Sequence, residues 1–96
     1  MTIKWSLQAQ IDYWSNIEYL ENDWSENDVI SFIDAVNYNI GLLATSTVSF
    51  SKTRYQNVFK VVISKQITLF YSTTKDTIIL LRFWNNYQNL SNFKLR

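Results

Sequence analysis

Apolar positions at spacings of three and four residues run through the first half of the chain, as expected of amphipathic helices. The pattern predicts a first helix from Leu7 to about Asn22, with Ser6 as its N-cap. Its core-facing stripe is expected to consist of Ile11, Trp14, Ile17, Leu20 and Trp24. Three acidic residues of the same segment are expected on the solvated face, namely Asp12, Glu18 and Glu21.

A second helix is predicted to begin at Ser25, where Asp28 three residues later resembles a capping box. Its apolar stripe has the same spacing and consists of Val29, Phe32, Ile33, Val36, Ile40 and Leu43. Only a few residues separate the two helical segments. The helices must therefore lie as an antiparallel hairpin.

The second half of the chain changes to β-branched and apolar runs after a Ser/Thr-rich loop at residues 45–51. Strands are predicted at Val58–Ile63, Ile67–Thr73 and Thr77–Trp84, joined by tight turns into an antiparallel meander. The near-continuous apolarity of the last strand indicates a central position, and the alternating segment Thr2–Trp5 is expected to pair with it as an edge. This order defines an α+β fold, a helical hairpin packed on one face of a small antiparallel sheet.

Composition narrows the class of protein. The 96 residues are expected to form a single domain over positions 1–96, and 47% of them are hydrophobic. The chain has no Cys and no His, which excludes disulfides and imidazole chemistry, so neither a metal nor a cofactor is expected. It contains no Gly-rich phosphate loop and no nucleophile elbow. No apolar run is long enough for a bilayer and the N-terminus lacks a secretory signal, so we expect a cytoplasmic protein with no membrane partner.

The net charge of +1 conceals two halves of opposite sign. Residues 1–48 contain seven acidic residues and one basic residue, a net charge of −6. Residues 49–96 contain eight basic residues and one acidic residue, a net charge of +7. This segregation favours an anionic partner for the second half; the alternative is an acidic layer that compensates a basic one within the molecule.

Four basic residues are candidates for a functional surface. Lys52 and Arg54 lie in the loop before the sheet, whereas Lys60 interrupts the first strand of the meander and Arg82 the last. Side chains of one parity share a face of a sheet, so Lys60 and Arg82 can project from the face opposite the helices and form, with Tyr87, a cationic surface edged by a ring. Such a surface suits RNA, because cations stabilise phosphate charge and rings stack on bases.

A structural role is the competing interpretation of these residues. Lys60 and Arg82 would then be ordinary solvent-facing sheet residues. An arginine within so apolar a strand must also find a partner, and a carboxylate of the first helix, such as Glu18 or Asp12, is within its expected reach.

The order of elements and three stretches of the chain resemble the RelE/ParE superfamily of bacterial type II toxins, and the ParE-like (plasmid stabilisation) branch most of all. The stretches are KWSLQAQIDYWSNIEYL at 4–20, SENDVISFIDAVNYNIGLLA at 25–44 and VFKVVISKQITLFYSTTKDTIILLRFW at 58–84, followed by the tail NNYQN. The resemblance covers nearly the whole chain. It implies the fold predicted above for a RelE/ParE-like toxin domain.

The resemblance also implies a function: the toxin of a toxin–antitoxin pair, held by a cognate antitoxin in a hetero-oligomer. In the ParE-like branch the toxin poisons DNA gyrase by binding it. The target-binding residues would then be Lys52, Arg54, Lys60, Arg82, Tyr87, Gln88 and Asn89.

Two alternatives remain open. The ribonuclease branch implies a ribosome-dependent mRNA endonuclease, with Arg54, Lys60 and Arg82 on phosphate and Tyr87 near the scissile nucleotide. The tail also departs from the ParE-like pattern Arg-Gln-(Asn/Asp)-Pro, because Tyr87 replaces the arginine and Leu90 the proline. A relative that binds a partner without being toxic is therefore the third possibility.

Overall fold

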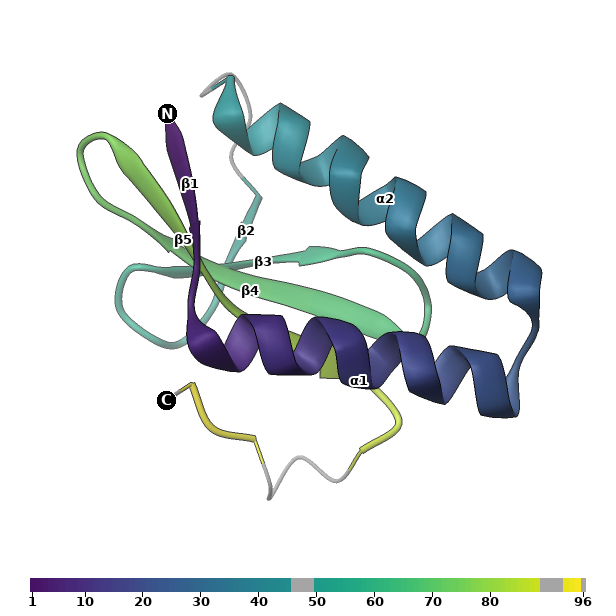
Figure 1. The fold of residues 1–96 in the computed structure, drawn as a ribbon. Coiled ribbons are helices and arrows are strands. Elements are labelled where there is room, and N and C mark those ends of the chain that lie inside the picture. The colour runs from purple at the N-terminus through teal and green to yellow at the C-terminus, as the bar shows by residue number, and fades with distance from the viewer. Residues whose placement is uncertain (46–49, 89–92, 96) are drawn as a thin grey trace.

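The computed structural model describes residues 1–45, 50–88 and 93–95 of the chain (Figure 1). Two helices lie side by side as a hairpin and pack against a five-stranded sheet. The predicted α+β architecture is confirmed. In chain order the elements are β1 (Thr2–Trp5), α1 (Leu7–Asp23), α2 (Glu26–Ala44), β2 (Ser51–Lys52), β3 (Val58–Val62), β4 (Ile67–Thr73) and β5 (Thr77–Asn85).

Both helices begin where the sequence predicts, because each has a serine cap. The Ser6 hydroxyl accepts a hydrogen bond from the backbone N–H of Ala9 at 2.9 Å. Ser25 and Asp28 form the predicted capping box: each side chain accepts from the other residue's backbone N–H, at 3.2 and 3.1 Å. These bonds satisfy N–H groups that a helix start otherwise leaves without partners.

The sheet has the strand order β1-β5-β4-β3-β2. Strands β3, β4 and β5 form the predicted antiparallel meander, and β5 is an interior strand next to the middle one. The edge strand β1 pairs with β5 in parallel, which makes the sheet mixed. The short strand β2 pairs with β3 and was not predicted. It begins at the last residue of the loop expected at 45–51 and ends one residue after it.

The parallel direction of β1 decides where α1 lies. The ladder between β1 and β5 ends at Trp5 and Leu80, and the N–H of Ser6 adds one more bond to the Leu80 carbonyl at 3.1 Å. Because β1 and β5 run the same way, the chain enters α1 beside the second half of β5. This part of β5 has no strand on that side.

The core lies between the helices and the sheet. Its largest fully buried side chains come from α1, α2, β4 and β5: Leu20, Phe32, Val36, Leu43, Ile67, Leu69, Tyr71, Leu80 and Phe83. The predicted stripe of α2 is confirmed, since its members are buried or pack against the core.

The predicted stripe of α1 is wrong for three residues. Ile11, Trp14 and Trp24 are 49%, 67% and 39% exposed, and Asp12, expected on the solvated face, is buried. The buried face of α1 instead consists of Ala9, Asp12, Asn16, Ile17 and Leu20. The helix turns a different face to the core than the apolar stripe predicts, because Asp12 and Asn16 of the buried face form hydrogen bonds with β5.

Candidate target-binding surface

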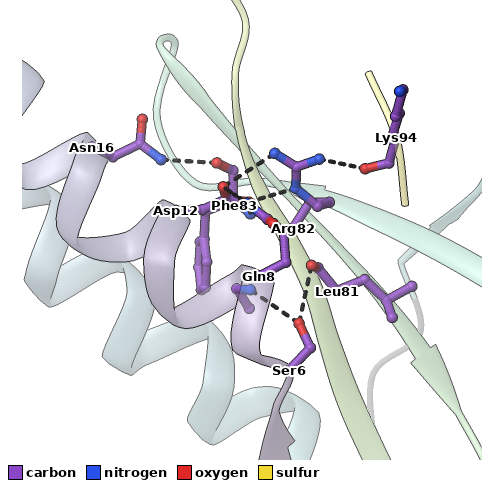
Figure 2. A network of polar contacts seen from close by, with 9 residues as sticks. Ser6, Gln8, Asp12, Asn16, Leu81, Arg82, Phe83 and Lys94 are labelled. Carbon is purple, nitrogen blue, oxygen red and sulfur yellow. Dashed lines mark hydrogen bonds and ion pairs between the residues drawn. The ribbon is translucent and has the colours of Figure 1, made fainter. Parts of the chain in front are cut away.

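Side chains of α1 complete the free edge of β5. The Ser6 hydroxyl donates to the Leu81 carbonyl at 3.2 Å, and the Asn16 amide donates to the Phe83 carbonyl at 2.8 Å. The Asp12 carboxylate accepts from the N–H of Phe83 at 3.1 Å (Figure 2). These bonds take the place of a neighbouring strand, because buried backbone groups need partners.

Arg82 is the centre of this network. Its Nε and Nη2 donate to the two oxygens of Asp12, at 2.6 and 3.1 Å, and its Nη1 donates to the Lys94 carbonyl. The Arg82 and Asp12 side chains are 13% and 10% exposed, so the ion pair is mostly buried. Figure 2 shows Arg82 between α1 and the segment that carries Lys94. Each guanidinium nitrogen thus has an acceptor, and the structural alternative for Arg82 holds, with Asp12 as its partner.

Strand pairing places Lys60 and Arg82 on one face. Lys60 pairs with Phe70, and Phe70 pairs with Arg82, so the three form a row across β3, β4 and β5. Their parity is opposite to that of the core residue Leu69, so the row lies on the face away from the helices, as predicted. Lys60 is exposed, whereas Arg82 is not.

The other two predicted cations lie beside this row. Arg54 is exposed; its guanidinium stands over the Tyr55 ring, 5.2 Å from the centroid, and donates to the Tyr55 hydroxyl at 3.1 Å. Lys52 is also exposed but pairs with Phe59, so its parity directs it to the helix side of the sheet edge. Lys52, Arg54 and Lys60 therefore surround the edge formed by β2 and β3, whereas Arg82 lies on β5.

Residues 93–95 cover part of the face away from the helices, a contact we did not predict. The Phe93 ring lies among those of Phe70, Trp84 and Tyr55, with centroids 4.7, 4.9 and 6.2 Å away. A cleft of about 670 Å³ adjoins it and is lined in part by Val58.

Tyr87 belongs to a different cluster. Its ring stacks on Trp24 at a centroid distance of 6.2 Å and an interplanar angle of 9°. The ammonium of Lys65 lies 5.6 Å from the Trp24 ring, and the indole N–H of Trp24 donates to the Tyr19 hydroxyl at 3.0 Å. Tyr87 is 57% exposed and Gln88 is exposed. Sequence reasoning missed Trp24 and Lys65 here because Trp24 fits the apolar stripe of α1.

The predicted target-binding residues thus fall into two groups. Lys60 and Arg82 share the sheet face, with Arg54 and Lys52 at its edge, whereas Tyr87 and Gln88 lie where the chain leaves β5. Asn89 lies outside the described residues. Within the described ranges, no group of three or more His, Cys, Asp or Glu residues gathers as a metal site. No helix among residues 1–45 and 50–88 is long and apolar enough to cross a membrane.

These features define a small α+β fold whose helical hairpin covers one face of a mixed sheet. This is the fold of the RelE/ParE toxins of type II toxin–antitoxin systems.

Three solved structures carry that comparison. A chain of the chromosomal ParDE toxin–antitoxin system of P. aeruginosa has a TM-score of 0.72 and 11% identity, with 88% of this chain and 95% of that chain covered. A copper-bound mutant toxin from Helicobacter pylori has a TM-score of 0.65 and 17% identity, covering 90% and 94%. The YoeB dimer from Staphylococcus aureus has a TM-score of 0.62 and 15% identity, with 91% of this chain and 98% of that chain covered. The sequence matches no protein-family model and no curated protein.

Proposed function

We propose that the chain is the toxin of a type II toxin–antitoxin pair, held in a complex by a cognate antitoxin and acting in the cytoplasm. The observation that carries the proposal is the exposed basic edge of Lys52, Arg54 and Lys60 on a RelE/ParE toxin fold. The proposed target is DNA gyrase, which the toxin poisons by binding. Arg82 supports this surface by fixing β5 to α1, and Tyr87, Gln88 and Asn89 are proposed to extend the contact beyond β5.

The bonding of the buried charged groups supports binding rather than chemistry. Asp12 accepts from Gln8, at 2.9 Å, as well as from Phe83 and twice from Arg82. A general base needs a free lone pair within reach of the proton that it removes. Asp12 has its oxygens occupied by these donors, so it serves the fold, and the exposed cations are left for recognition.

The test is induction of the chain in bacteria, followed by a gyrase assay with purified protein. We expect growth arrest and trapped gyrase–DNA cleavage complexes. The triple variant Lys52→Glu/Arg54→Glu/Lys60→Glu should abolish both effects and keep a native circular dichroism spectrum. Lys75→Glu, a reversal of an exposed lysine in the β4–β5 turn, is the matched control and should stay toxic. Supercoiling that is unaffected at high toxin excess would reject gyrase as the target.

The antitoxin half of the proposal has its own test. An open reading frame beside the toxin gene should rescue growth when co-expressed, and its product should co-purify with the chain. Normal growth on strong induction of soluble protein would instead support the non-toxic, partner-binding alternative.

A ribosome-dependent mRNA endonuclease is the second candidate. The observation that favours it is the exposed Trp24–Tyr87 stack with Lys65, since rings and cations are the groups that hold single-stranded RNA. In that case Arg54, Lys60 and Arg82 would contact phosphate. Tyr87 would lie near the scissile nucleotide. Mapping of mRNA 5′ ends in induced cells decides: codon-linked cleavage supports this candidate, and unchanged ends reject it.

A further inference from the structure

We infer that the outward face of α1 is a docking site for a basic amphipathic helix of a partner protein. Five exposed side chains, spaced alternately by four and three residues, form this face, and we call them the α1 ridge: Leu7, Ile11, Trp14, Glu18 and Glu21. The inference goes beyond the proposed function, because the basic edge at β2 and β3 takes no part in it.

The first half of the ridge is apolar and faces solvent. Leu7, Ile11 and Trp14 are 72%, 49% and 67% exposed. Single exposed apolar residues are ordinary on a protein surface, whereas a row of three large ones marks a contact surface. Their spacing of four and three residues is also the heptad spacing by which one helix pairs with another. The ridge therefore suits a helix as its partner.

A cleft adjoins the apolar half of the ridge. It has a volume of about 310 Å³ and is lined by Trp5, Gln10, Tyr13 and Trp14. The rings meet nearly at right angles, since Tyr13 lies edge-to-face against Trp5 at 89° and against Trp14 at 85°. Such a cleft can accept one large apolar side chain, as a hole in a coiled coil accepts a knob of the facing helix.

A second cleft lies at the acidic half of the ridge, where α1 meets the start of α2. It has a volume of about 410 Å³ and is lined by Glu21, Glu26, Val29 and Ile30. Neither carboxylate forms an ion pair within the described part of the chain. Two carboxylates beside two aliphatic side chains suit a lysine or an arginine, whose stem is apolar and whose end is charged.

Charge decides between the possible occupants of the ridge. The helices contain seven acidic residues, four in α1 and three in α2, and no Lys or Arg. A second copy of the chain thus has no basic helix to offer, and an anionic lipid surface or RNA would be repelled. A partner helix whose apolar stripe continues into Lys or Arg matches both halves of the ridge, and its charge fixes the direction of pairing.

The test uses the purified full chain and a fluorescein-labelled helical peptide of three heptads, followed by fluorescence anisotropy. The a and d positions of the peptide are Lys in the first heptad and Leu in the other two, with Ala and Gln elsewhere. An antiparallel arrangement then places Lys opposite the acidic half of the ridge. One control peptide has Glu in place of every Lys, and another has Gln in place of every Leu. We expect saturable binding of the basic Leu peptide, and binding weaker by roughly tenfold or more for both controls.

Two variants of the chain have matched controls. Trp14→Gln should weaken peptide binding roughly thirtyfold, because a Trp at the centre of a contact is a typical hot spot of binding. Tyr38→Gln removes a ring on α2 that is also 67% exposed, and it should leave binding unchanged. Glu18→Lys should weaken binding, whereas Asp76→Lys, the same change of charge at an exposed residue of the β4–β5 turn, should not.

A ¹⁹F spectrum of the wild-type chain, labelled with fluorotryptophan, locates the bound peptide. The resonances of Trp14 and Trp84 are assigned with Trp14→Phe and Trp84→Phe. The resonance of Trp14 should move when the peptide binds, whereas that of Trp84, whose side chain is buried, should not. This measurement does not depend on the folding of any ridge variant.

Several outcomes would overturn the inference. Each of the following is sufficient: equal affinity of Trp14→Gln and the wild type, equal binding of the Glu peptide, or a Trp14 resonance that does not move. Self-association of the wild type that Trp14→Gln abolishes would assign the ridge to a second copy instead. Peptide binding and growth arrest are separate readouts, so failure of the ridge and failure of the toxin proposal are distinguishable.

Discussion

Asp12 and Arg82 lie 70 residues apart in the sequence and form a two-bond ion pair that joins α1 to β5. The same carboxylate accepts from the backbone N–H of Phe83, so it also closes the free edge of the strand. The arginine that interrupts the most apolar strand of the sheet is thereby explained, because burial of its guanidinium requires a paired charge.

Removal of either member of this pair should destabilise the fold. Arg82→Ala and Asp12→Ala should each lower the free energy of unfolding by about 3–5 kcal/mol, since each leaves a buried charge without its partner. Urea unfolding followed by tryptophan fluorescence measures the difference. The double variant Asp12→Leu/Arg82→Met removes both charges together and should be closer to the wild type than either single variant. Losses below about 1 kcal/mol in both single variants, a magnitude typical of exposed pairs, would contradict a structural role.

The stability of Arg82→Ala affects any toxicity experiment. A variant that loses both toxicity and folding says nothing of target binding. Lys60→Ala is the more informative change, because Lys60 is exposed on the same face and has a side chain in solvent.

Trp14 and Leu20 lie on the same helix and should respond oppositely to substitution. Trp14 is 67% exposed and Leu20 1%. Trp14→Gln should therefore change the free energy of unfolding by no more than about 0.5 kcal/mol, as exposed sites do. Leu20→Ala should cost about 2–5 kcal/mol, because it leaves a cavity in the core. Thermal unfolding of the two variants measures this contrast, and a large loss in Trp14→Gln would restore the stripe that the sequence predicts.

The error at Trp14 shows what hydrophobic periodicity can establish. The period locates both helices, because the turn of a helix sets the spacing of its apolar side chains, and Ser6 and Ser25 locate the caps through local hydrogen bonds. It counts every apolar residue as a core residue, however, and it cannot detect that Asp12 and Asn16 are needed inside. These polar side chains are needed because β1 ends at Trp5, opposite Leu80, and leaves the second half of β5 without a neighbouring strand on that side. This is a property of the assembled sheet.

Alternation along the strands was more reliable for the candidate site. The shared face of Lys60 and Arg82 follows from strand parity, which the sequence alone provides. The positions of Tyr87 and Phe93 could not be predicted, since they depend on how the chain continues after β5. No periodic pattern constrains that segment, and its contacts with Trp24 and Phe70 are between residues distant in sequence.

If the stacked pair at the end of α1 binds RNA, its two rings should contribute separately. Trp24→Leu and Tyr87→Leu should each weaken binding of a single-stranded RNA hexamer by about 1–3 kcal/mol, the contribution of one base stacked on a ring. Tyr87→Phe keeps the ring and should retain the affinity. Tyr38→Leu removes another exposed ring, on α2, and is the control. Fluorescence anisotropy gives the dissociation constants of the wild type and the four variants; five equal values would exclude this cluster as an RNA site.

Tyr71 should make the fold sensitive to alkaline pH. Its side chain is 2% exposed, and burial raises the pKa of its hydroxyl above the ordinary value of 10.0, although a hydrogen bond from the N–H of Phe50 partly opposes this. The pKa is higher in the folded than in the unfolded chain, so the neutral phenol stabilises the fold fully below about pH 10. This contribution is lost as the pH rises through the folded-state pKa.

Comparison with Tyr71→Phe isolates this residue, because other groups also titrate at high pH. Burial raises the pKa of Tyr13 in the same direction, and Tyr13 is present in both proteins. Near neutral pH the variant should lose about 0.5–1.5 kcal/mol with the missing hydrogen bond. From about pH 8 to pH 11 its melting temperature, followed by circular dichroism, should fall less than that of the wild type. Parallel declines would mean that the Tyr71 hydroxyl ionises equally well in the folded and unfolded chain, and that its burial carries no cost for the charged form.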